Sequence, residues 1–181
     1  GAAPTDPELD QIVSYLLQID DREGGGPPPQ VWASQDVGAV AAAGSFSENS
    51  GTFTIQASGA DIWGNLDEFH YAYQTLDGDG EIVARVASLG GTHIWAKAGL
   101  MLRDGLAPNA RHAIMLVSHG KGADFQYRAT TGGVTAPSQT SDGVTQAPTW
   151  LRLVREGNLF TGYISADGVN WVAEDSAVLN L

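Results

Sequence analysis

The chain has 181 residues, no cysteine, and 21 acidic against 9 basic residues, which gives a net charge of −12 at pH 7. The absence of cysteine excludes disulfides, thiol nucleophiles and cysteine-ligated metals. The acidic balance argues against general nucleic-acid binding, which needs a basic surface. No apolar run is long enough to span a membrane, and a hydrophobic content of 43% is typical of a globular chain.

Residues 6–20 predict one N-terminal helix. Asp6 is a good N-cap, Pro7 suits the first helical position, and apolar residues follow at helical spacing. Residues 21–30 contain three glycines followed by three prolines, a composition typical of a linker. We therefore interpret residues 1–20 as the helical tail of an upstream domain, 21–30 as a linker and 31–181 as the folded domain. The alternative is a helix that docks on the main domain.

From residue 31 onward the pattern predicts strands separated by turn residues, with no helix between them. The expected strands are 44–48, 51–57, 68–75, 81–88, 95–103, 111–118, 123–130, 149–156, 159–165 and 170–178. About ten short strands at regular spacing favour an all-β, antiparallel jelly-roll sandwich. The polar, Gly- and Pro-rich stretch 131–148 is expected to be a long loop.

Positively charged residues gather within these strands although the chain is acidic. Side chains alternate between the two faces of a strand. In each of the relevant strands the cation or amide therefore lies opposite the apolar residues, and we expect these polar residues and two tryptophans to share one sheet face. The predicted ligand-binding residues are His70, Gln74, Trp95, Lys97, Arg103, Gln126, Arg128, Trp150 and Arg152.

Such a face fits a sugar, because hydroxyl groups pair with Arg, Gln and His while the apolar face of a sugar ring stacks on Trp. The alternative is that this face binds no ligand. Cations on a strand face are often the solvated side of a half-buried sheet, paired with cross-strand carboxylates such as Glu68, Glu81 and Asp104.

Several segments resemble a known family. GADIWGNLDEFHYAYQT (59–75), DGEIVARVASLGGTHIWAKAGLMLR (79–103), FQYRATTGG (125–133) and WLRLVREGNLFTGYISADGVNW (150–171) are similar to bacterial concanavalin A-like β-sandwich domains of unknown function, sometimes labelled "regulation of enolase"-like. The resemblance covers about residues 31–181. It implies a jelly roll with a concave sheet, in a large secreted protein, and related folds host lectins, glucanases and carbohydrate-binding modules.

The N-terminal segment PELDQIVSYLLQI resembles the last helix of a c-type cytochrome domain. A haem attachment motif needs cysteines, so the resemblance implies that any cytochrome lies upstream. Together these observations predict a non-catalytic carbohydrate-binding module of an exported bacterial multidomain protein. We expect an extracellular or periplasmic location, a polysaccharide or glycan as ligand, and no nucleic-acid or membrane partner.

Two other classes of function stay open. One is a structural or protein-interaction module without a glycan site. The other is a glycoside hydrolase or a polysaccharide lyase. Asp67 and Glu68 are adjacent and point to opposite faces, so they do not form the carboxylate pair that hydrolysis needs. A lyase would use His70, Tyr71, Lys97 and Arg103 to neutralise a uronate and abstract a proton.

Two short motifs are further candidates for a site. Asp77, Asp79 and Glu81 in DGDGE supply oxygen ligands for calcium, or else the segment is a hairpin turn, which we favour. Trp63 lies between glycines in GADIWG, where it either projects into a site or is buried, and we slightly favour burial.

Overall fold

The computed structural model describes residues 15–18, 31–91, 93–137 and 141–181, and these residues contain strands but no helix. Accordingly, this part of the chain has no helix that could cross a membrane. The prediction of an all-β, antiparallel fold is confirmed, and every strand ladder is antiparallel.

Strands occupy all ten predicted segments. They are β3 (Ser45–Asn49), β4 (Thr52–Gln56), β7 (Phe69–Tyr73), β8 (Gly80–Val86), β9 (Lys97–Arg103), β10 (His112–Ser118), β11 (Gly122–Arg128), β13 (Thr149–Glu156), β14 (Leu159–Ser165) and β15 (Val172–Val178). Short strands outside the predicted set are β1 (Tyr15–Gln18), β2 (Ala33–Val37), β5 (Ile62–Trp63), β6 (Leu66–Asp67) and β12 (Ala136–Pro137).

The predicted N-terminal helix is wrong for residues 15–18, which form β1 and pair with β4, with Tyr15 opposite Ile55. Pairing with a neighbouring strand supplies backbone hydrogen bonds that override a weak local helix preference. The rest of the predicted helix and the predicted linker at 21–30 lie outside the described residues.

Two four-stranded sheets pack face to face. Sheet I has the order β15-β14-β13-β8 and sheet II the order β12-β11-β10-β9. The residues buried between them come from both sheets: Ala84, Val86, Ala98, Leu100, Ala113, Met115, Val117, Ala123, Phe125, Leu151, Leu153 and Phe160. Gly162 of β14 lets the sheets approach closely, because a Cβ there would lie 2.7 Å from both Met115 Sδ and Phe125.

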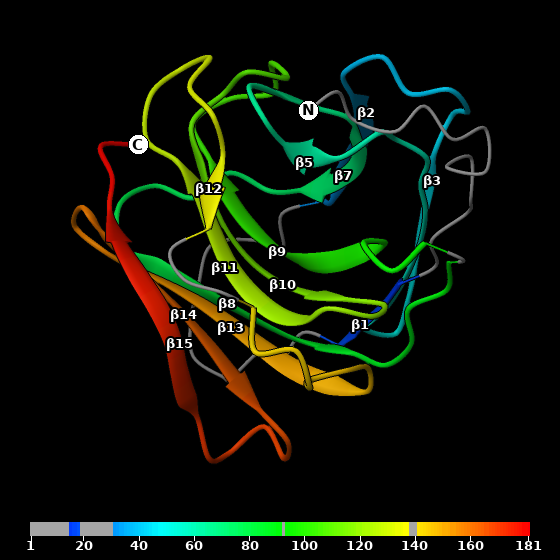
Figure 1. Ribbon diagram of the computed structural model, residues 1–181. Helices are drawn as coiled ribbons and strands as arrows, with labels where there is room; N and C mark the ends of the chain where they lie inside the picture. Colours follow the sequence, from blue (N-terminus) through cyan, green and yellow to red (C-terminus); the bar gives the residue numbers. More distant parts are fainter. Residues whose placement is uncertain (1–14, 19–30, 92, 138–140) are drawn as a thin grey trace.

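The outer face of sheet II is also covered. Met101, Ile114 and Leu116 of sheet II pack with Ile62 of β5, and Phe69 and Tyr71 of β7 lie against this second cluster. Figure 1 shows sheet II between sheet I and the β5 and β7 segments. All seven residues of β10 are therefore buried. This agrees with the nearly unbroken apolar run of its sequence, which is typical of a strand covered on both faces.

Three smaller sheets complete the fold. β2 pairs with β7, β5 pairs with β6, and β1, β4 and β3 form a three-stranded sheet. The β5–β6 hairpin places Ile62 in the core and Trp63 in solvent, since neighbouring residues of a strand point to opposite sides. The hairpin therefore presents Trp63 at the edge of sheet II.

Candidate functional site

Arg128 of β11 is a buried structural residue. Its side chain is 0% exposed and forms a two-pronged ion pair with Asp67, with Nη1–Oδ2 at 2.9 Å and Nη2–Oδ1 at 2.6 Å. Its other contacts are with Thr135 Oγ1 and with the backbone carbonyls of Gly64, Pro108, Ala110 and Gly133. A guanidinium whose donors are used in this way is not available to a ligand.

Arg103 belongs to the same buried network. Its Nη2 lies 3.4 Å from Asp67 Oδ2. Its Nε donates to the Gly105 carbonyl, and its Nη2 donates to the Ala107 carbonyl. The guanidinium carbon lies 5.3 Å from the Phe69 ring centre and 5.9 Å from that of Tyr71. Burial lowers the pKa of Arg103, and the Asp67 charge acts in the opposite direction. Through these ring contacts, Arg103 of sheet II packs against β7.

His70 and Gln126 are also buried. His70 faces away from sheet II, because its neighbours Phe69 and Tyr71 face towards it, and its Nδ1 lies 2.7 Å from Asp36 Oδ1. Gln126 donates to Asp124 Oδ2 at 2.8 Å. Gln74 follows the end of β7 on the exposed surface.

Trp150 and Arg152 lie on a different sheet from Lys97, Arg103 and Arg128. Both belong to β13 of sheet I, on the face opposite the buried Leu151 and Leu153. Arg152 pairs with Glu81 at 2.6 Å and lies over the Tyr163 and Trp171 rings, so its partners are internal. The prediction of one shared ligand-binding face is therefore wrong, because alternation assigns faces within a strand and not the sheet to which the strand belongs.

Two acidic side chains of the DGDGE segment have partners within the protein. Asp79 Oδ1 accepts a hydrogen bond from the Gly157 amide at 2.6 Å, and Glu81 pairs with Arg152. Among the described residues, no group of three or more acidic or histidine side chains is arranged to hold a metal ion. Calcium binding by Asp77, Asp79 and Glu81 stays a prediction.

Tyr71 is one of the four residues of the lyase alternative, with His70, Lys97 and Arg103. Its hydroxyl donates to the Met101 carbonyl at 2.9 Å. Burial raises the pKa of Tyr71 to about 12, while the Arg103 charge opposes that rise. The phenol is therefore protonated at neutral pH and poorly suited to act as a general base.

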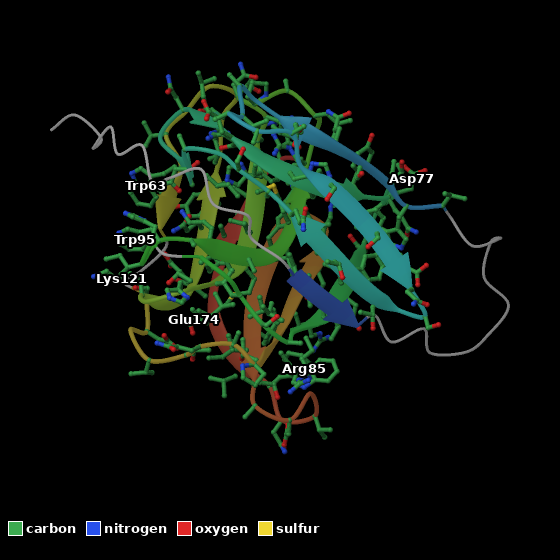
Figure 2. The ribbon with its side chains drawn as sticks, turned by 90° about the vertical axis from the view of Figure 1, so that its right-hand side faces the viewer. Trp63, Asp77, Arg85, Trp95, Lys121 and Glu174 are labelled. Atoms are coloured by element: carbon green, nitrogen blue, oxygen red, sulfur yellow. The ribbon has the colours of Figure 1, made fainter. Side chains whose placement is uncertain are left out.

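A different group of residues lies at the surface, and we call it the tryptophan surface: the exposed Trp63 and Trp95 with the partly buried Asp61, Lys97 and Lys121. Trp63 is 45% exposed and Trp95 is 41% exposed. Lys97 Nζ forms an ion pair with Asp61 Oδ1, and it lies 6.0 Å from the Trp95 ring centre. Figure 2 shows Trp63, Trp95 and Lys121 along one edge of the molecule.

The tryptophan surface adjoins a cleft of about 1590 Å³. Asp61, Trp63, Trp95 and Lys97 contribute to its lining, as do aromatic side chains from the β4 and β7 strands, Phe53, Tyr71 and Tyr73. The lining combines apolar and aromatic side chains with charged ones, among them Glu68 and Arg103, and such a mixture can hold a glycan or another small molecule.

Sequence reasoning found Trp95 and Lys97 but not the others. Trp63 was expected to be buried, and it is exposed. Asp61, Trp63 and Lys121 come from the β5 hairpin and from the turn between β10 and β11, which only the tertiary fold brings beside Trp95. The unusual pattern of tryptophan between glycines in GADIWG was the available signal.

No protein-family model, curated protein or solved structure matches this chain.

Proposed function

We propose that this β-sandwich is a non-catalytic carbohydrate-binding module and that the tryptophan surface is its glycan site. The observation that carries the proposal is the exposure of Trp63 and Trp95 beside the Asp61–Lys97 ion pair. An indole ring stacks on the apolar face of a sugar, and the Asp61 carboxylate, whose side chain is 41% exposed, offers an acceptor to hydroxyl groups.

The exposed indoles supply enough energy for a modest affinity. A sugar that covers either ring would remove roughly 60–110 Å² of apolar surface from water, worth roughly 1.5–2.5 kcal/mol. Two such contacts give roughly 3–5 kcal/mol before the entropy lost on binding is subtracted, so by themselves they support a dissociation constant no tighter than about the millimolar range.

The wider setting is part of the same proposal. The resemblance to concanavalin A-like domains supports a jelly-roll topology, and the Gly- and Pro-rich segment 21–30 supports a multidomain parent protein. We place that protein outside the bacterial cytoplasm, in the periplasm or beyond, next to a domain that resembles a c-type cytochrome. Calcium, if bound through DGDGE, would act on the hairpin and not on the tryptophan surface.

Alanine at Trp63 or Trp95 should weaken glycan binding by roughly tenfold to fiftyfold, because each change removes one stacking ring. The measurement is calorimetry on the glycans that bind in an array, with thermal melting recorded for each variant. Trp171→Ala is the matched control, since Trp171 lies near Arg152 on sheet I. Equal losses in all three variants, or unchanged affinity in the first two, would contradict the assignment of the site.

A protein-interaction module is the second candidate, and one observation favours it. Leu66 and Ile94, neighbours of Trp63 and Trp95 in the chain, are 57% and 48% exposed, which enlarges the apolar part of this region. An array with no glycan binder, together with concentration-dependent association that Leu66→Ser and Ile94→Ser abolish, would favour this candidate over carbohydrate binding.

A further inference from the structure

Lys121 is the cation of the tryptophan surface that forms no ion pair with a described carboxylate. Within the described residues, the following cations form ion pairs with carboxylates: Lys97, Arg103, Arg111, Arg128 and Arg152. Lys121 has no carboxylate within 4.0 Å among those residues, and its Nζ lies 5.5 Å from the Trp95 ring centre. Arg85 also forms no ion pair with a described carboxylate, but it lies on sheet I and not beside Trp95.

The backbone beneath Lys121 is held in place. Its amide donates to Ser118 Oγ at 2.9 Å, and that hydroxyl donates to the Gly122 carbonyl at 3.1 Å. Ser118 is buried at the end of β10. The tight β10–β11 turn therefore presents the Lys121 side chain from a fixed base beside Trp95.

The tryptophan surface contains two ammonium groups and one carboxylate. Asp61 pairs with Lys97, while Lys121 has no described carboxylate within 4.0 Å. The protein as a whole carries −12. Asp142, whose Oδ1 accepts a hydrogen bond from the Ala123 amide, lies near the β10–β11 turn, and carboxylates farther than about 8 Å are largely screened at physiological ionic strength. The Lys121 ammonium is the group that a bound anion would contact at this position.

We infer that the ligand of this surface is an acidic glycan, whose anionic group pairs with Lys121 while its sugar ring stacks on Trp95. This inference rests on the proposed function. An ammonium binds a carboxylate or a sulfate as a compact point charge, so uronic-acid and sulfated glycans share the required chemistry. A neutral glycan would satisfy the tryptophans but would leave Lys121 without a counter-ion.

The test compares matched acidic and neutral glycans at 0.15 M NaCl. The probes are oligogalacturonate and its methyl ester, and chondroitin sulfate and desulfated, carboxyl-esterified chondroitin. We expect at least one acidic member to bind about fivefold or more tightly than its neutral counterpart, the factor expected for a solvent-accessible ion pair of about 1 kcal/mol. Preference within the oligogalacturonate pair shows that a carboxylate is sufficient. Chondroitin sulfate carries both anions, so preference within the chondroitin pair alone indicates that the sulfate is required.

Lys121→Gln should remove this preference and leave the affinity for the neutral member unchanged. Arg85→Gln is the matched control, because it changes the net charge by the same amount. Arg85 lies on sheet I opposite Trp150, and Figure 2 shows it far from Lys121 in that view. Both variants are checked by thermal melting.

The outcomes separate the inference from the proposed function. Neutral glycans that bind as tightly as acidic ones would overturn the acidic preference alone. Equal losses in Lys121→Gln and Arg85→Gln would also overturn it, because they would indicate a diffuse field and not a contact. If no glycan of either kind binds, the proposed function fails and the inference fails with it.

Discussion

Replacing Asp67 with alanine is expected to lower the free energy of unfolding by about 3–5 kcal/mol, since it leaves the buried Arg128 guanidinium without its counter-ion. Both side chains are 0% exposed, and two short hydrogen bonds join them. Arg103 lies 3.4 Å from the same carboxylate and would lose its only described ion pair. A loss of this size is a large part of the stability of a typical domain.

The matched control is Glu81→Gln, which breaks the Arg152–Glu81 pair on the surface. Those side chains are 30% and 50% exposed, so the expected loss is only about 0–1 kcal/mol. Urea denaturation of both variants at pH 7 provides the comparison. Similar midpoints for Asp67→Ala and Glu81→Gln would show that the buried pair contributes little to stability.

A double replacement of Asp67 and Arg128 by apolar residues should not restore stability. Exchange of a buried ion pair for hydrophobic residues is often tolerated, but here the guanidinium also bonds several backbone carbonyls. Removing it would leave buried acceptors without donors, at about 1–3 kcal/mol for each such group. Arg128 therefore joins β11 to the β5–β6 hairpin that carries Trp63.

The strands of the sandwich could be predicted because the cause of each strand is local. Alternating apolar residues and turn-forming glycines are visible in the sequence, and all ten predicted segments contain strands. The sequence also predicted which residues of a strand share a face. In β9, Ala98 and Leu100 contact the core between the sheets, while Met101 lies on the opposite face.

The candidate site was less predictable because it depends on which strands become neighbours. Arg128 and Arg152 have the same local pattern, a cation between apolar residues, yet one is buried beneath a hairpin and the other is partly exposed on another sheet. The burial of Arg128 follows from Asp67, 61 residues away, which no alternation rule connects to it. The apolar run of β10 was the available sign that the cationic face of sheet II would be covered.

His112 gives the second large effect, a loss of stability in acid. The imidazole is 0% exposed and lies between Arg103 and Arg128 in the strand register. Burial, followed by the charges of Arg128 and Arg103, lowers the pKa of His112 to about 3. The ordinary value of 6.5 applies to the unfolded chain, which therefore binds the proton first as the pH falls.

The sign of the effect follows from this order of protonation. Above pH 6.5 the imidazole is neutral in both states and has no effect on the pH dependence. Between pH 6.5 and about 3 only the unfolded state gains the proton, so His112 lowers stability by about 1.4 kcal/mol per pH unit, or roughly 4–5 kcal/mol in all.

The measurement is the free energy of unfolding from urea titrations at half-unit steps from pH 7 to pH 4. His112→Phe keeps a flat ring without a titrating group, so the slope of stability against pH should become shallower whatever its stability at pH 7. His119→Phe is the matched control, because it removes an exposed imidazole that lies outside the buried network. Identical slopes for the parent and His112→Phe would mean that the buried histidine accepts a proton in the folded state, and that Asp67 compensates for its charge between the two arginines.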